Sequence, residues 1–137
     1  MRSPHRLFLQ AFIVGSAMSC CCAMAGDKGT DGKFYRVVDG KVDARTFNGF
    51  RRYHGSCNHC HGPDGVGSTI ASPLVDRLPG FERFQSIVRD GTTVGASVMK
   101  GFARDANIEP YIQDIYAYLQ ARADGAIGRG RPARLEP

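Results

Sequence analysis

The chain has 137 residues, a length typical of one small domain. Its formal net charge is +5 with no basic stripe interleaved with aromatic residues, which excludes a nucleic-acid-binding protein and favours acidic partners. Three of its five cysteines lie before Gly26, so the body of the chain has no disulfide framework.

The segment that precedes Gly26, residues 1–25, is typical of a cleaved export signal. Arg2 and Arg6 supply a positive start, residues 7–18 are apolar and uncharged, and Ala23-Met24-Ala25 matches the small-x-small pattern of signal cleavage. The uncharged stretch is also about long enough for a membrane anchor, and acylation of one of its cysteines would make a lipoprotein. Because no basic cluster follows it, we expect cleavage, a periplasmic location and no stable membrane span afterwards.

Residues 26–45 are predicted to form an N-terminal extension. Its polar, Gly-rich beginning indicates a flexible leader. Residues 34–43 predict two short extended pieces joined by a tight turn at Asp39-Gly40. The principal domain then covers residues 46–124.

Residues 46–60 predict a helix that Asp43 or Thr46 could cap. Because an α-helix returns to the same side about every four residues, several of its side chains share one face. These are Gly49, Tyr53 and Cys57.

Two further helices are predicted, over residues 81–89 and 107–122. The segments between the helices, residues 62–80 and 92–105, are predicted to be irregular, and irregular segments of such length are usually functional. Residues 125–137 form a Gly-, Pro- and Arg-rich tail that we expect to be loosely held. An apolar stripe typical of a buried face runs along the last helix at Ile108, Ile112, Ile115 and Leu119.

The pattern C-x-x-C-H occurs at residues 57–61. Two thiols three residues apart on a helical turn can each add to a haem vinyl group, and the adjoining histidine can then present a ring nitrogen to the iron. A zinc site would need further ligands, and a thioredoxin-like pair would need a βαβ setting that the sequence does not show. The motif therefore predicts one covalent haem c, held by Cys57, Cys60 and His61.

Met99 is the predicted second axial ligand. No other methionine occurs after the expected cleavage site, and Met99 lies in a predicted irregular segment. A thioether opposite His61 raises the haem potential and suits an electron acceptor. A core-filling role for Met99 is the alternative. His54 and His59 are rival ligands, although His59 lies between the two cysteines and His54 is expected at the surface.

Beyond the motif, a set of spaced residues comprises Gly49, Tyr53, Met99 and Tyr118-Leu119. Together with C-x-x-C-H, this set resembles the class I, mitochondrial-type cytochromes c. The resemblance implies an all-α fold of three to four helices around one covalent haem, preceded by a short extended segment.

The same resemblance implies particular contacts. The Pro73 carbonyl would accept a hydrogen bond from the ring nitrogen of His61 that does not bind iron, which orients that ring. Leu74 would pack on the haem face. Close helix packing is implied between two groups of residues, Gly49 and Tyr53 on the first helix and Ile115, Tyr118 and Leu119 on the last.

Residues 34–134 are similar to the methanol-metabolism-related c-type cytochromes, which accept electrons from PQQ-dependent methanol dehydrogenases, notably the lanthanide-dependent kind. The segments YRVVDGKVDARTFNGFRRYHGSCNHCHGPDGVGST and YIQDIYAYLQARADGAIGRGRP carry this resemblance. It implies a periplasmic one-electron carrier rather than an enzyme. Its donor would be a PQQ-dependent methanol or alcohol dehydrogenase, and its acceptor a downstream cytochrome or oxidase of the respiratory chain.

Two departures from this family are visible. Lys100 follows Met99 where the family usually has proline, and the chain lacks the second cysteine pair that members often carry. Two other functions stay open as alternatives. One is a haem enzyme or sensor with an open or labile sixth coordination site, and the other is a haem subunit of a larger respiratory complex.

Overall fold

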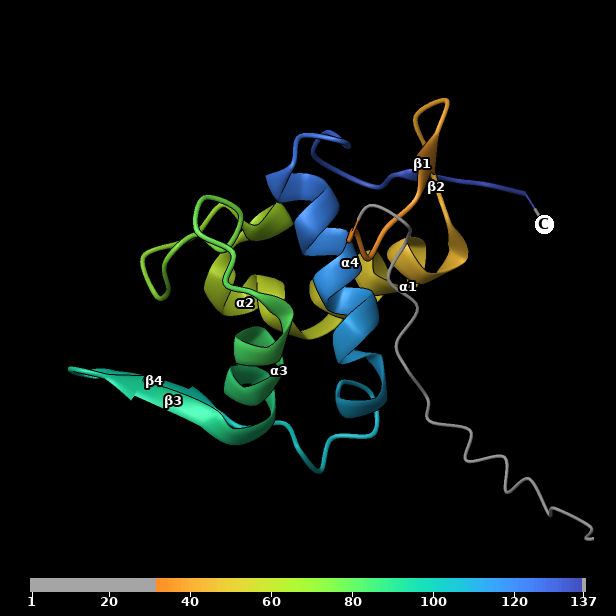
Figure 1. Ribbon diagram of the computed structural model, residues 1–137. Coiled ribbons are helices and arrows are strands. Elements are labelled where there is room, and N and C mark those ends of the chain that lie inside the picture. The colour runs from red at the N-terminus through yellow and green to blue at the C-terminus, as the bar shows by residue number, and fades with distance from the viewer. Residues whose placement is uncertain (1–31, 137) are drawn as a thin grey trace, which may run out of the picture.

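The computed structural model describes residues 32–136. The expected export signal, residues 1–25, and the start of the extension lie outside the described residues. The body consists of α1 (Ala44–Arg52), a short α2 (Asn58–His61), α3 (Phe81–Asp90) and α4 (Ile112–Ala123), as Figure 1 shows. None of the helices between residues 32 and 136 has the length and hydropathy needed to cross a bilayer.

Two small sheets correct the all-α expectation. β1 (Val37–Val38), β2 (Lys41–Val42) and β5 (Ala133–Arg134) form one sheet in the order β1-β2-β5. β3 (Gly91–Val94) and β4 (Ser97–Lys100) form an antiparallel hairpin that projects beyond the end of α3 (Figure 1). The fold is therefore mainly helical with short strands.

The β3–β4 hairpin replaces most of the segment that the sequence predicts to be irregular. Its strands contain the β-branched residues Thr92, Thr93, Val94 and Val98, and the connection is the residue pair Gly95-Ala96. β-Branched residues around a two-residue, Gly-containing connection are a hairpin signal. The strands are so short that they show no clear alternation of apolar and polar residues.

The extended pieces of the N-terminal segment are confirmed. Val37 pairs with Val42 and Val38 with Lys41 in an antiparallel ladder. The turn between them places Asp39 at φ 50° and Gly40 at φ 74°, both left-handed, which is the backbone of a type I′ hairpin. The short ladder leads directly into α1.

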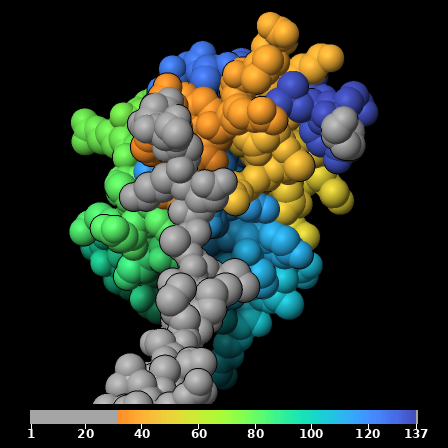
Figure 2. All heavy atoms as spheres, turned by 45° about the vertical axis from the view of Figure 1, so that its right-hand side comes forward, coloured from red at the N-terminus to blue at the C-terminus, as the bar shows by residue number. Residues whose placement is uncertain are grey.

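The tail is ordered rather than loosely held, which corrects the prediction. β5 runs parallel to β2, with Ala133 opposite Lys41 and Arg134 opposite Val42. The Leu135 N–H donates to the Val42 carbonyl at 2.8 Å. Figure 2 shows the dark-blue end of the chain lying against the orange and yellow segments of the extension and α1. A two-residue strand gives no periodic signal, so the sequence could not reveal it.

The two candidate caps of α1 are now distinguished. The Asp43 side chain accepts a hydrogen bond from the Thr46 N–H at 2.9 Å and caps the helix. The Asp43 carboxylate also accepts the Arg36 N–H at 2.6 Å, which ties the extension to the start of α1. Both bonds satisfy backbone donors that would otherwise lack partners.

α4 is the central element of the core and packs against both α1 and α3. The predicted apolar stripe is buried, because each of its side chains is at most 2% exposed. The predicted helix over residues 107–122 is not continuous, however, because Ile108 precedes a 3-10 turn (Glu109–Tyr111) and α4 begins only at Ile112. Tyr116 on the side toward α3 contacts the rings of Phe34, Phe81 and Phe84. The stripe residues are Ile108, Ile112, Ile115 and Leu119.

The close approach of α1 and α4 at Gly49 is also confirmed. A Cβ atom on Gly49 would overlap the Asp114 carbonyl oxygen and would lie 3.0 Å from the Tyr118 Cβ. One turn later, the ring centroid of Tyr53 lies 5.7 Å from that of Tyr118. The two helix backbones therefore touch at Gly49, and any larger residue would separate them.

We expect Gly49→Ala to lower the free energy of unfolding by about 1–3 kcal/mol, because the added methyl group would force the helices apart. Denaturant unfolding of the purified protein measures this change. Gly55→Ala is the matched control, since a Cβ at Gly55 meets nothing within 4 Å. Equal stability of the two variants would contradict the close contact.

Candidate functional site

The predicted helix over residues 46–60 is interrupted just before the motif. A π turn (Tyr53–Cys57) separates α1 from α2, and the Asn58 N–H donates to the Tyr53 carbonyl, five residues back. One extra residue rotates the following turn by about 100° relative to an uninterrupted helix. π Turns of this kind occur frequently at functional sites.

The two cysteines of the motif are not joined by a disulfide. Cys57 is partly buried and Cys60 is exposed. Burial, with a smaller contribution from the neighbouring Cys60, raises the pKa of the Cys57 thiol to about 11.

His61 has a fixed ring orientation. Its Nδ1 lies 3.1 Å from the Ser72 carbonyl oxygen. When Nδ1 carries the proton and donates to this oxygen, Nε2 keeps its lone pair for a metal. The predicted acceptor is the Pro73 carbonyl, and the structure corrects it to the preceding residue. Pro73 instead packs against the loop, where its nitrogen would lie 2.8 Å from a Cβ on Gly67.

The loop after His61 is tightly closed. The Gly67 N–H donates to the His61 carbonyl at 2.8 Å. A Cβ on Gly62 would overlap the Gly67 carbonyl oxygen, so only glycine fits there. The buried Tyr53 hydroxyl donates to the Gly62 carbonyl at 2.6 Å. The loop is thus held to the helix that precedes the motif.

Asp64, which the sequence did not single out, is a buried carboxylate in this loop and is 4% exposed. It accepts hydrogen bonds from the Tyr118 hydroxyl at 3.0 Å, the Gly130 N–H at 3.1 Å and Arg129 Nε at 3.3 Å. His54 Nε2 lies 3.3 Å from the same carboxylate. Burial alone would raise the pKa of Asp64, but the bonds from Gly130, Tyr118 and Arg129 outweigh it and hold that pKa below its ordinary value. Asp64 is therefore ionised at neutral pH.

His54 is partly exposed, with 25% of its side-chain surface accessible, and neighbouring residues hold its ring. Its Nδ1 lies 3.0 Å from the Phe50 carbonyl oxygen, and its Nε2 faces Asp64. Its ring centroid is 4.3 Å from that of Phe50. Both ring nitrogens are therefore engaged within the protein. His59, the other rival ligand, is exposed.

The structure brings Cys57, Cys60, His61 and the loop containing Pro73 together, whereas Met99 lies on the separate β3–β4 hairpin. Met99 is opposite Thr92, near the base of the hairpin, rather than in an irregular segment as predicted. Its side chain is partly buried and packs against the hydrophobic core, as do those of Cys57 and Leu74.

Four exposed aliphatic side chains lie on two segments of the described chain. The loop after His61 carries two of them and the β3–β4 hairpin carries two more. They are Val66, Ile70, Val94 and Val98.

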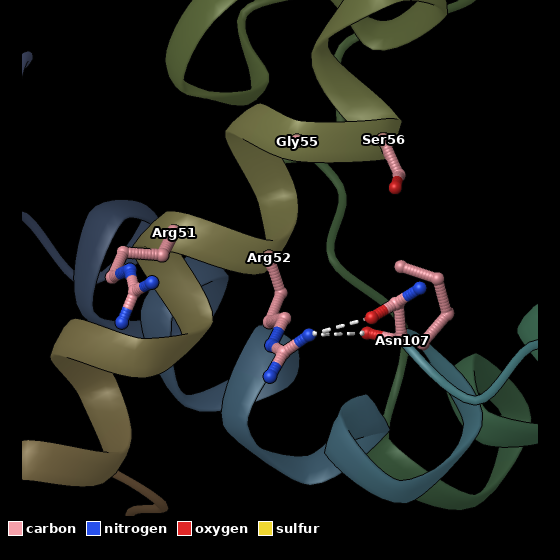
Figure 3. A pocket seen from close by; sticks show the side chains of 6 residues that line it. Arg51, Arg52, Gly55, Ser56 and Asn107 are labelled. Carbon is pink, nitrogen blue, oxygen red and sulfur yellow. Dashed lines mark hydrogen bonds between the residues drawn. The ribbon is translucent and has the colours of Figure 1, made fainter.

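A polar cavity of about 330 Å³ lies directly before Cys57 in the chain (Figure 3). The Arg52 guanidinium is 3.8 Å from the Tyr111 ring centroid, and its Nη1 lies 3.3 Å from both the carbonyl and the Oδ1 oxygen of Asn107. Arg51 is exposed and directed to the other side of α1 (Figure 3). The lining residues are Arg51, Arg52, Gly55, Ser56, Asn107 and Ile108.

Comparison with known proteins identified two curated relatives. The chain is 44% identical over 109 residues to cytochrome c-553I of Paracoccus denitrificans, covering 74% of this chain and 48% of the relative. It is 31% identical over 90 residues to cytochrome c-555 of Methylococcus capsulatus, covering 65% of this chain and 72% of the relative. The chain thus spans about half the length of the first relative and most of the second.

Among solved structures, the chain is similar to the c-type cytochrome XoxG from Methylobacterium extorquens AM1. The TM-score is 0.72 at 43% sequence identity, and the match covers 79% of this chain and 70% of the other. No family model matches the chain.

Tyr53→Phe is expected to lower the free energy of unfolding by about 0.5–1.5 kcal/mol, because it removes the hydrogen bond to the Gly62 carbonyl without opening a large cavity. Denaturant titration measures the change. Tyr35→Phe is the control, since its hydroxyl binds Asp124 at the exposed surface. A loss in the control as large as that in Tyr53→Phe would argue against a specific role for the buried bond.

Proposed function

Because the chain belongs to the class I c-type cytochromes, we propose that it carries single electrons from a PQQ-dependent methanol or alcohol dehydrogenase to a downstream cytochrome or oxidase. As a member of this family, it carries covalently bound haem c, and its single C-x-x-C-H motif provides one attachment site. The bound haem supplies the one-electron oxidation and reduction, while the protein supplies ligands, burial and a docking surface.

In the proposal, Cys57 and Cys60 hold the haem through thioether bonds and His61 binds the iron through Nε2. The observation that carries it is the contact of His61 Nδ1 with the Ser72 carbonyl at 3.1 Å, which leaves Nε2 as the free ring nitrogen. The two cysteines, which form no disulfide, and the exposed Val66 and Ile70 of the following loop are compatible with a haem at this place.

Met99 is proposed as the second axial ligand. It is the only methionine among the described residues, and its side chain is partly buried. The rival His54 has both ring nitrogens engaged with Phe50 and Asp64. Lys100, which follows Met99, holds its ammonium group 5.1 Å from the Phe102 ring centroid. A filled sixth position favours electron transfer over the binding of gas or peroxide.

The identity of the donor rests on the resemblance to the methanol-metabolism-related c-type cytochromes, which the similarity to XoxG supports. The location rests on the predicted export signal: cleavage after Ala25 would release a periplasmic protein that begins at Gly26. We also keep the domain boundaries proposed from the sequence. They are an extension over residues 26–45, a haem domain over residues 46–124 and a tail over residues 125–137.

We propose that the donor docks beside the cavity at Arg52, with the exposed Arg51 on the adjoining side of α1. Because Gly55 and Ser56, which directly precede Cys57, form one wall of that cavity, a partner seated there would be close to the attached haem. The guanidinium groups favour an acidic partner surface, and so does the net charge of the mature chain, which falls from +5 to +3 when Arg2 and Arg6 leave with the signal. Encounters of this kind are small and short-lived, typically burying less than about 1,200 Å².

The ligand assignment predicts the ferric spectrum. The parent protein should be low-spin with a weak sulfur-to-iron charge-transfer band at the red end of the spectrum. Met99→Ala should abolish that band and lower the reduction potential, because a thioether ligand favours ferrous iron. Val98→Ala, one residue away on β4, is the control and should keep both. An unchanged spectrum in Met99→Ala would reject Met99 as a ligand.

The donor assignment predicts rapid haem reduction when oxidised protein is mixed with a PQQ-dependent methanol dehydrogenase and methanol. The second-order rate constant should fall as salt rises, because opposite charges steer the encounter. The double variant Arg51→Gln, Arg52→Gln should lose about tenfold at low salt, whereas Arg83→Gln on the exposed face of α3 should not. If the dehydrogenase does not reduce the parent protein on a turnover timescale, the donor assignment is wrong.

A further inference from the structure

Three segments that are distant in the sequence meet at the buried Asp64 carboxylate. His54 comes from the π turn before the motif, Tyr118 from α4, and Arg129 and Gly130 from the C-terminal tail. An ionised buried group with this many donors is costly to disturb, because losing one partner leaves charge without compensation.

The backbone of Asp64 is also unusual. It has φ 59° and ψ 19°, the left-handed region that a residue with a side chain rarely adopts. Strain of this kind persists only where surrounding contacts enforce it, and it is common at functional sites. Here the contacts to the carboxylate enforce it, so the loop conformation depends on Asp64 being held.

A short chain of contacts leads from Asp64 to the ring of His61. The next residue, Gly65, accepts a hydrogen bond from the Leu74 N–H at 2.8 Å through its carbonyl. This bond fixes the part of the loop that contains Ser72, whose carbonyl faces His61 Nδ1 at 3.1 Å. The position of the Ser72 carbonyl, and with it the ring plane of His61, therefore depends on the backbone at residues 64 and 65.

The tail is anchored well enough to act as a support. Before Arg129, the Ile127 carbonyl accepts a hydrogen bond from Arg122 Nη1 at 2.9 Å. After Gly130, the guanidinium groups of Arg131 and Arg134 lie 5.0 Å and 5.8 Å from the Phe47 ring centroid, and β5 pairs with β2. The chain is thus fixed on both sides of the two residues that contact Asp64.

We propose that Asp64 is a positioning residue for the axial ring of His61, and that the C-terminal tail holds Asp64 in place through Arg129 and Gly130. The inference rests on the proposed function, in which His61 binds the haem iron. It assigns the Arg-rich tail a role in orienting an axial ligand, in addition to its place in the small sheet.

The test uses the full-length holoprotein and its ferric NMR spectrum. The haem-methyl resonances of a low-spin ferric haem follow the plane of the axial imidazole, whereas a simple loss of stability does not move them while the protein is folded. Asp64→Asn keeps the shape of the side chain and removes its charge. Asp124→Asn is its control, an exposed carboxylate that accepts a bond from Tyr35.

A second pair of variants tests the tail. Arg129→Gln removes one donor to Asp64, and Arg131→Gln removes a neighbouring arginine that stacks on Phe47 instead. We expect Asp64→Asn to shift the haem-methyl pattern, Arg129→Gln to shift it less and in the same sense, and both controls to keep the pattern of the parent.

Parent-like patterns in both Asp64→Asn and Arg129→Gln would overturn the inference. Should Asp64→Asn fail to fold, Arg129→Gln and Tyr118→Phe, which removes another donor to Asp64, decide the question. A parent protein without a low-spin haem would instead reject the proposed function, so the two failures are distinguishable.

Discussion

The direct contact between α1 and α4 at Gly49 is the constraint on which the rest of the structure depends. Because no side chain separates Gly49 from the Asp114 carbonyl, the two helices cross at backbone distance. That crossing brings the Tyr53 ring beside Tyr118, and the hydroxyl of Tyr53 then reaches the Gly62 carbonyl just after the motif. The hydroxyl of Tyr118 reaches the Asp64 carboxylate, two residues further along the same loop. One helix pair thus fixes the beginning of the loop that follows His61.

What could be predicted from the sequence was what a local pattern encodes. The turn at Asp39-Gly40 and the apolar stripe from Ile108 to Leu119 are each encoded by residues close together in the chain, and both are found as expected. The tail strand and the role of Asp64 depend on partners that are distant in the chain, such as Gly130, and no local pattern records them. The hairpin was missed because its short strands do not show their period.

The structure also explains why His61, His54 and Pro73 have different roles around the motif. His61 has one ring nitrogen directed at a carbonyl and the other free, which suits a metal ligand. His54 has both ring nitrogens facing oxygen atoms, those of the Phe50 carbonyl and the Asp64 carboxylate, so neither nitrogen is free to bind a metal. The proline expected to orient His61 supports the loop by packing, and the neighbouring Ser72 provides the carbonyl. The sequence distance between Ser72 and Pro73 is too small for a family resemblance to separate them.

The central claim is that Cys57 and Cys60 hold a haem covalently and that His61 is one of its axial ligands. Acid–acetone extraction of the purified protein, followed by mass spectrometry of the polypeptide, tests the attachment most directly. The account predicts that the colour stays with the protein and that its mass equals the mature chain plus one haem, while the double variant Cys57→Ala, Cys60→Ala releases any haem into the organic layer. Release of the haem from the parent protein would contradict the account.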